Sequence, residues 1–309
     1  MRFCVSGASG FLGTALCAHL SEQGHQVTRL VRRASGTPDE SRWDPARHEV
    51  DQRVIDTADV VVNLAGAAIA RWPWTESYKR KLVESRITST STLAAAIAKV
   101  DGDKPALISG SGMAAYGDDR GAELLDEDAG PGGGYLNHVV GRWEAATAEA
   151  EQAGARVCQL RTSLVLHRDG GALRLMSIPF KLGLGARLGS GRQYFSVISR
   201  RDWVRGVEFL ATNASASGPY NLAAPQSSTN AEFTKALADQ LHRPSALVVP
   251  TFAIKLALGE LSSELLGSMR VEPKRLLDAG FDFEDPDLES VLAEALRGAG
   301  LPDLGVTSA

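Results

Sequence analysis

The chain has 309 residues, a formal net charge of −4 and 23% charged residues. This balance excludes the basic surface that nucleic-acid-binding proteins need, and charged residues interrupt the apolar stretches before they reach the length of a membrane span. A chain of this length can bury a large core, which indicates one large domain or two unequal ones.

The first residues lead directly into a predicted strand, which leaves no room for a signal peptide. The three cysteines, Cys4, Cys17 and Cys158, lack metal-binding spacing and fall within predicted strands or a helix, as small buried hydrophobic residues do. We therefore expect a cytoplasmic protein without a metal site, acting on a small molecule. A homodimer is a candidate assembly, whereas nucleic-acid and membrane partners are not expected.

Residues 1–6 predict a short buried strand that runs into the glycine loop Gly7–Gly13, a helix to about residue 24 and a second strand over 26–32. Strand, glycine turn, helix and strand in this order are typical of a dinucleotide-binding site. Gly7 would permit the tight turn, Gly10 would let the backbone approach a pyrophosphate, and Gly13 would let the helix pack closely. The N–H groups of the loop, which contains Ser9, Phe11 and Leu12, and the helix dipole would hold the phosphates.

The end of the second strand predicts which dinucleotide binds. An acidic residue there would bond the ribose 2′-hydroxyl of NAD, whereas arginine accommodates a 2′-phosphate. The chain has Arg32 and Arg33 at this point, and the next acidic residue is Asp39. Guanidinium groups bind phosphate oxygens in pairs, so the sequence predicts NADP(H).

Strand and helix patterns continue to alternate after a polar stretch over 33–54, which predicts an α/β fold with a Rossmann-type, doubly wound parallel sheet. The small residues that end the third strand would let a cofactor approach the backbone. The expected elements are strands over 58–66, 105–111, 155–166 and 219–222 and helices over 75–100 and 135–153.

From Gly170 the pattern becomes irregular and rich in glycine. The loop 183–196 is a candidate substrate site, because closely spaced glycines let a chain lie flat against a ligand. Arg192, Gln193 and Tyr194 would supply a cation, an amide and a phenol. The tail is expected to be mostly helical, with Asn230 as the N-cap of one helix and Asp285 before Pro286 as the start of another.

Several segments together resemble the atypical extended short-chain dehydrogenase/reductases of the epimerase family, often labelled nucleoside-diphosphate-sugar epimerases. The glycine spacing G-x-x-G-x-x-G is similar to theirs, and further matching segments lie at 143–144, 161–166, 179–193, 218–225 and 230–233. The resemblance implies an NADP-binding Rossmann domain over 1–169 with about 197–224. It also implies a smaller, mostly helical C-terminal substrate domain over about 170–196 and 225–300, with 301–309 as a tail.

The resemblance also implies further cofactor contacts. They would fall on Leu64 and Ala65 after the third strand, on Lys81 and Arg86 in the following helix, and on Val165 near the nicotinamide.

Active members of the family combine serine or threonine, tyrosine and lysine. The lysine, four residues after the tyrosine, lowers the pKa of the phenol, which is ordinarily about 10. Ser111 fits the serine position, with Ser109 as the alternative, and Tyr135 fits the tyrosine position, but Val139 stands at the lysine position.

His138 and Arg142 are the cations that would share the helical face of Tyr135 and replace the lysine in part. Two functions therefore stay open. One is an NADP(H)-dependent oxidoreductase or epimerase for a small hydroxylated substrate, with a sugar nucleotide as one candidate. The other is a non-catalytic NADP(H)-binding protein that reports redox state to a partner.

Overall fold

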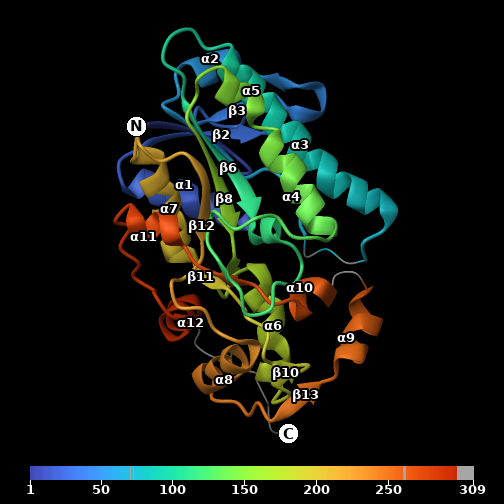
Figure 1. The fold of residues 1–309 in the computed structure, drawn as a ribbon. Coiled ribbons are helices and arrows are strands. Elements are labelled where there is room, and N and C mark those ends of the chain that lie inside the picture. Colours follow the sequence, from blue (N-terminus) through green and yellow to red (C-terminus); the bar gives the residue numbers. More distant parts are fainter. Residues whose placement is uncertain (70, 72, 260–261, 298–309) are drawn as a thin grey trace, which may run out of the picture.

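A computed structural model of the chain describes residues 1–69, 71, 73–259 and 262–297, so the tail expected at 301–309 lies outside the described residues. Its centre is an eight-stranded sheet in the order β12-β8-β6-β5-β1-β2-β3-β4, parallel throughout except for the antiparallel pair β3–β4 (Figure 1). The strands are β1 (Arg2–Ser6), β2 (Gln26–Val31), β3 (Glu40–Asp44), β4 (Glu49–Val50), β5 (Val60–Asn63), β6 (Ala106–Gly112), β8 (Val157–Thr162) and β12 (Gly218–Leu222).

Helices cover both faces of this sheet because neighbouring strand residues point to opposite sides. Val62 of β5 packs in the cluster that contains Leu16 of α1 (Phe11–Glu22) and Val207 of α7 (Arg200–Thr212). The preceding Val61 packs with Leu93 of α3 (Glu76–Ala98) on the other face. The helices α2 (Gln52–Asp56), α4 (Tyr135–Ala145) and α5 (Ala148–Gln152) complete this layer. The doubly wound Rossmann-type fold predicted from the sequence is confirmed.

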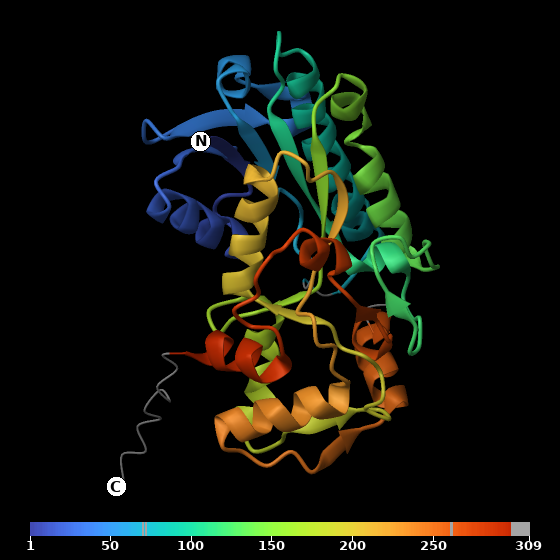
Figure 2. The ribbon, with the colours of Figure 1, turned by 60° about the vertical axis from the view of Figure 1, so that its left-hand side comes forward.

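A second body lies beyond the carboxyl ends of the strands (Figures 1 and 2). Its core joins Leu173, Phe233 and Val291 from three different helices. Its main elements are α6 (Gly171–Lys181), β10 (Ala186–Leu188), α8 (Asn230–Leu241), β13 (Leu247–Val249), α9 (Thr251–Leu258), α10 (Ser262–Leu266) and α12 (Leu288–Leu296). The paired strands β9 (Leu164–Leu166) and β11 (Val197–Ser199) contribute residues to the cores of both bodies. The short elements η1 (Pro45–Arg47), η2 (Met113–Tyr116), β7 (Leu124–Leu125), β14 (Arg270–Val271) and α11 (Lys274–Asp278) lie in the connections. None of the described helices is both long and apolar enough to span a membrane.

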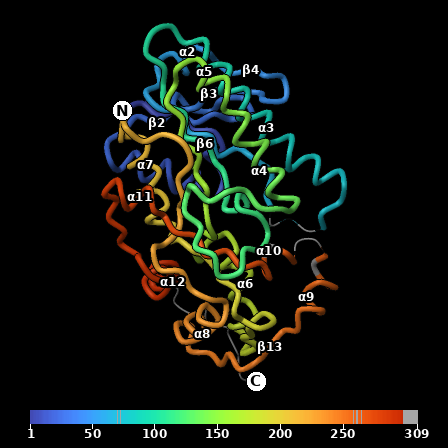
Figure 3. The backbone as a smooth tube through the Cα atoms, viewed as in Figure 1, coloured from blue at the N-terminus to red at the C-terminus, as the bar shows by residue number. Residues whose placement is uncertain are grey.

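Two predicted elements are each divided in the structure. The helix expected over 135–153 breaks at Ala146 and Thr147 into α4 and α5. The strand expected over 155–166 becomes β8, which stays in the central sheet, and β9, which leaves it to pair with β11. Figure 3 follows the backbone from β8 down into the second body and back to the sheet at β12.

The N-cap predictions are wrong by one or two residues. Thr229 caps α8 in a capping box with Glu232, whereas the side chain of Asn230 accepts the N–H of Leu188 at 2.8 Å. The helix expected at Asp285 begins at Leu288 with Asp287 as its N-cap. Asp285 does not cap it because its carboxylate binds Arg201 at 2.7 Å.

The sequence analysis also missed whole elements. Helix α6 begins at a glycine pair and contains Pro179, two features that normally argue against a helix. The polar stretch over 33–54 holds β3, the edge strand β4 and the start of the short helix α2. Edge strands carry polar residues and leave a weak hydrophobic pattern, so this miss follows from their position.

Candidate functional site

The glycine loop is held in place by backbone contacts that leave no room for side chains at its two ends. Gly7 has a φ of +69°, and a Cβ there would lie 2.6 Å from the carbonyl group of Leu64. A Cβ on Gly13 would lie 2.2 Å from the carbonyl oxygen of Gly7. The loop therefore packs directly on the end of β5, where Leu64 and Ala65 are half-buried.

Gly10 differs from Gly7 and Gly13 in its surroundings. Its φ of −79° suits any residue, and an added Cβ would meet only the Gly7 oxygen, at 3.2 Å. Gly10 and Ser9 are exposed, whereas Phe11 and Leu12 are half-buried at the start of α1. No side chain caps α1, and its first turn contains no acidic residue. The loop thus presents bare backbone and the positive end of a helix, which together favour an anion.

Arg86 is a buried cation next to Gly66, in the segment that follows β5. Its residue is 7% exposed, and burial lowers the pKa of its guanidinium to about 10. The guanidinium donates to the Leu82 carbonyl at 3.0 Å and stacks 5.0 Å from the centre of the Trp143 ring. A Cβ on Gly66 would be in van der Waals contact with it. No acidic residue among the described ones pairs with it. A buried charge without a counter-charge is costly, so this position favours an anionic or strongly polar ligand.

A buried hydrogen-bond chain fixes the ring on which Arg86 stacks. The Trp143 indole donates to Thr90 at 3.0 Å, and Thr90 accepts the amide of Asn63 at 2.8 Å. Asn63 in turn accepts the hydroxyl of Ser6 at 2.6 Å. The chain links β1, β5, α3 and α4 beneath the glycine loop and holds Trp143 in one orientation.

The two arginines after β2 have different surroundings. Arg33 forms a two-pronged ion pair with Glu40 of β3, at 2.6 and 2.7 Å. The Arg33 hydrogen bond, followed by the Gly36 N–H, lowers the pKa of Glu40 to about 2. Arg32 is exposed and has no hydrogen-bond or ion-pair partner in the described part of the chain. Of the two predicted phosphate ligands, Arg32 is the one left open.

Two further residues were predicted to bind the cofactor: Val165 is buried near the glycine loop, and Lys81 is exposed on α3. Val165 is buried on β9, and its carbonyl oxygen lies 3.1 Å from where a Gly171 side chain would begin. The same position is 3.1 Å from the Phe11 ring, so Val165 lies next to the glycine loop. Lys81 is exposed on α3. Because five residues turn an α-helix by about 140° beyond one full turn, Lys81 and Arg86 point in different directions.

The sequence analysis missed a cation beside Phe11. Arg200 lies 5.6 Å from the centre of the Phe11 ring and donates to Nε2 of His167 at 2.8 Å. Burial, and then the charge of Arg200, lower the pKa of His167, so the imidazole is a neutral acceptor. These residues come from β9 and α7, far apart in the sequence, and no local motif signals their meeting.

The hydroxyl of Ser111 binds a carboxylate that the sequence analysis did not assign to the site. Its hydroxyl donates to Glu144 at 2.6 Å, and Glu144 also binds Arg161 through two hydrogen bonds of 2.9 and 3.0 Å. Burial opposes the charge of Arg161, but Glu144 outweighs it and raises the arginine pKa. Arg161 continues to the buried phenol of Tyr116, which donates to Asn221 at 2.7 Å. The signal for this network is a charged residue, Arg161, within an otherwise apolar strand.

Tyr135 faces α3. Its phenol donates to the Lys79 carbonyl at 3.0 Å, its ring lies 5.9 Å from that of Trp74, and the Lys79 ammonium is 5.4 Å from the ring centre. No hydrogen bond joins Tyr135 to Ser111. Val139 is buried, whereas His138 and Arg142 are exposed. The cation over the Tyr135 ring is Lys79 of α3.

Two side chains of the predicted substrate loop already contact other parts of the protein. Gln193 is buried and donates to the Leu188 carbonyl at 3.0 Å, which closes the turn after β10. The Tyr194 ring lies 5.1 Å from the Arg270 guanidinium. Arg192 is exposed and its side chain has no partner among the described residues. Of the three, Gln193 has its polar group occupied by the protein, and Arg192 is the most exposed.

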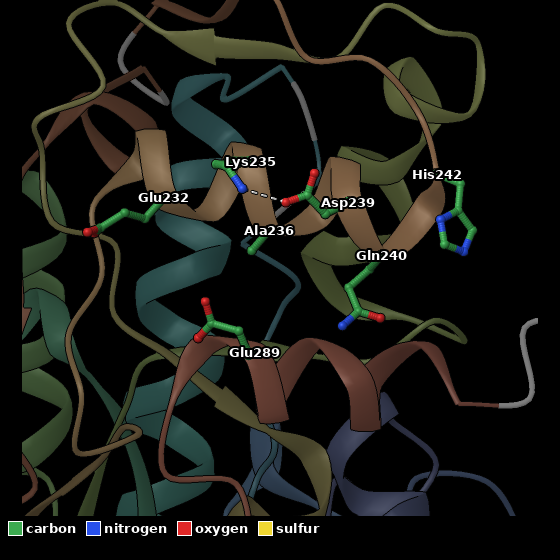
Figure 4. Close-up of a pocket in the computed structure, with 7 residues that line it drawn as sticks. All are labelled: Glu232, Lys235, Ala236, Asp239, Gln240, His242 and Glu289. Carbon is green, nitrogen blue, oxygen red and sulfur yellow. Dashed lines mark hydrogen bonds and ion pairs between the residues drawn. The ribbon is translucent and has the colours of Figure 1, made fainter.

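A separate pocket between α8 and α12 lies away from the glycine loop (Figure 4). Three of its polar side chains already have structural tasks. Lys235 pairs with Asp239 at 2.7 Å, and Glu232 belongs to the capping box of α8. The described residues also contain no cluster of side chains suited to a metal ion.

Comparisons with known proteins match both bodies of the chain. The model of the NAD-dependent epimerase/dehydratase family matches residues 3–223, and that of a domain of unknown function matches 249–295. An epimerase family protein of Mycobacterium bovis is 42% identical over 297 residues, which are 96% of this chain and 98% of that protein.

Two solved structures are similar over most of the chain. One is the human epimerase family protein SDR39U1 (isoform 2) with NADPH, at 32% identity and a TM-score of 0.87, covering 96% of this chain and 100% of the human one. The other is a nucleoside-diphosphate sugar epimerase from Corynebacterium glutamicum, at 33% identity and a TM-score of 0.79, covering 96% of this chain and 58% of that one.

Proposed function

The chain belongs to the NAD-dependent epimerase/dehydratase family, as its sequence motifs predict, and we propose that it is an NADP(H)-dependent oxidoreductase or epimerase for a small hydroxylated substrate. The observation that carries this proposal is the buried guanidinium of Arg86. It has no acidic partner among the described residues and lies against Gly66, two residues after Leu64, on whose carbonyl group Gly7 of the uncapped glycine loop packs. A dinucleotide would supply the missing negative charge.

The residues present fit NADP(H) in three places. The bare backbone at Gly10 and the start of α1 would hold the pyrophosphate. Arg32 would bind the 2′-phosphate, while Glu40 neutralises Arg33 and fixes the turn beside it. Val165, buried next to Phe11, would form part of the apolar surface under the nicotinamide. The human relative with NADPH supports this choice of cofactor.

When bound, NADP(H) supplies or accepts the hydride at a carbonyl or carbinol carbon. The chain must then hold the substrate oxygen and transfer its proton. Ser111 and Tyr135 remain the proposed residues, with Glu144 as the base that orients the Ser111 hydroxyl. For this role Tyr135 must release the Lys79 carbonyl when substrate arrives.

Cofactor preference tests the proposal directly. NADPH should bind at least about ten times more tightly than NADH, a difference of about 1.4 kcal/mol, and Arg32→Ala should erase most of it. Arg33→Ala is the matched control, because Arg33 already pairs with Glu40, and it should keep most of the preference. Fluorescence titration of both nucleotides measures this. Equal affinities for the wild-type chain would refute the assignment.

A non-catalytic NADP(H)-binding protein is the second candidate function. The hydrogen bonds of Ser111 and Tyr135 favour it, because each hydroxyl already donates to another group and no hydrogen bond joins the two. Replacing Tyr135 by Phe and Ser111 by Ala separates the candidates. Under the leading proposal, either change slows NADPH oxidation by a carbonyl substrate at least about 100-fold while NADPH affinity stays unchanged. Under the second, no turnover depends on either residue.

A further inference from the structure

One exposed face of α6 carries a row of apolar side chains, flanked by the exposed Arg174 and Lys181. Leu175, Ile178 and Leu182 are 58%, 50% and 68% exposed. Their spacing of three and four residues places them on one face of the helix, opposite the buried Leu173 and Phe180. Large exposed apolar side chains in such a row mark a surface that binds something.

This row starts at the proposed cofactor site. Helix α6 begins at Gly170 and Gly171, whose missing side chains would lie 2.6 and 3.1 Å from the Phe11 ring of the glycine loop. Leu175 is one turn further along the helix. The row then runs from there to Leu182, a rise of about 10 Å.

A second apolar row stands on α9. Phe252 and Leu256, four residues apart, are 73% and 87% exposed. The parallel pair β10–β13 connects the two helices, since β10 follows α6 and β13 precedes α9. Figures 1 and 2 show α6 and α9 both standing between this strand pair and the central sheet. We name Leu175, Ile178, Leu182, Phe252 and Leu256 the apolar face.

The proposed cofactor site and the apolar face together indicate a class of substrate. We propose that the apolar face binds the substrate, and that this substrate is a carbonyl compound or alcohol with an aliphatic chain rather than a sugar nucleotide. The inference rests on the proposed NADP(H) function. Its reason is continuity: the row begins one helical turn from the contact with Phe11, so a chain lying on α6 would have its reactive end at the cofactor. Of the three polar residues predicted to bind substrate, Gln193 already donates to the Leu188 carbonyl, and Arg270 stacks on the ring of Tyr194.

Binding of a series of alkyl methyl ketones, from butanone to decanone, to the full-length protein saturated with NADP⁺ tests the proposal. Calorimetry should show affinity rising about fourfold per added methylene group, the value for a fully buried methylene. The double variant Ile178→Gln with Leu182→Gln should lose most of this rise while its affinity for NADPH stays unchanged. Leu277→Gln, an exposed leucine on α11, is the matched control and should behave as the wild type.

The outcomes separate this inference from the proposed function. If NADPH binds but affinity for the ketones does not rise with chain length, or the double variant leaves the series unchanged, the substrate class is wrong and the cofactor proposal stands. If the ketone series rises without any binding of NADPH, the cofactor proposal fails instead. If sedimentation shows that the double variant converts a dimer to a monomer and the wild type shows no dependence on chain length, the apolar face is a subunit interface and the inference is overturned.

Discussion

The glycine loop and the apolar face of α6 and α9 are both exposed, yet they are built in opposite ways. The loop presents backbone, and its shape depends on side chains that are absent at Gly7 and Gly13. The apolar face presents large side chains that project from helices. A surface made of backbone recognises groups common to a whole class of cofactors, whereas a surface made of side chains can change with each substitution. The comparison assigns common chemistry to the first region and specificity to the second.

We propose that the two regions belong to two domains. The first contains 1–169 and about 197–224, which include the central sheet and the helices on its faces. The second contains about 170–196 and 225–300, as far as the described residues extend. Their cores are distinct, since Leu16 and Val207 pack in one and Leu173 and Phe233 in the other.

The largest effect is expected at Gly13, where the loop has no space. Gly13→Ala would place a methyl group 2.2 Å from the Gly7 carbonyl and should lower the free energy of unfolding by about 3 kcal/mol. Urea denaturation measures it. Gly141→Ala is the control, because nothing lies within 4 Å of that position in α4, and it should raise stability by up to about 1 kcal/mol. Equal stabilities for the two variants would show that the loop can relax.

At Gly10 the expected effect falls on binding and not on folding. Gly10→Val should reduce NADPH affinity at least about 100-fold, because the side chain would occupy the place of the pyrophosphate. Its urea midpoint should stay near that of the wild type, since only the Gly7 oxygen is close. Normal NADPH binding by this variant in calorimetry would make the glycine loop purely architectural.

Arg86→Met should affect the free and the bound protein in opposite directions. Methionine fills a similar volume without a buried charge, so the free protein should be as stable as the wild type or up to about 2 kcal/mol more stable. NADPH affinity should fall by about 30-fold, equivalent to about 2 kcal/mol. Thermal melts with and without NADPH measure both effects. A loss of stability in the free protein would mean that Arg86 serves the fold rather than a ligand.

The smallest effect concerns the Arg33–Glu40 pair. Since the pKa of Glu40 is lowered from 4.5 to about 2, its carboxylate stabilises the fold above pH 4.5, and this contribution is lost as the pH falls toward 2. Glu40→Gln should therefore lower the melting temperature at pH 7 and have no effect near pH 2. A difference in melting temperature that is the same at every pH would assign the effect of Glu40 to packing.

Local patterns were enough to predict the first region. The glycine spacing and the continuous apolar runs of β1 and β5 depend on neighbours in the sequence, so they predicted the loop, the sheet and its two covered faces. The ion pair of Arg33 with Glu40 was missed because β3, the strand that carries Glu40, was not predicted.

The proposed catalytic residues depend on directions that spacing does not give. Tyr135 fits the family spacing, but its phenol turns toward α3. Val139 is buried, so a lysine there would be an interior cation and not a simple replacement. The partners of Ser111 and Arg200 come from other elements, and only the folded chain brings them together.

The stacking of Arg86 on Trp143 gives this protein an optical signal of its own. Trp143 is one of five tryptophans, and its indole is held rigidly by Thr90. A nucleotide that draws the guanidinium away from the ring, or brings a reduced nicotinamide near it, changes the emission of that indole. Trp203, buried against the opposite face of the sheet, supplies an internal reference. Occupancy of the site can thus be followed by intrinsic fluorescence without any label.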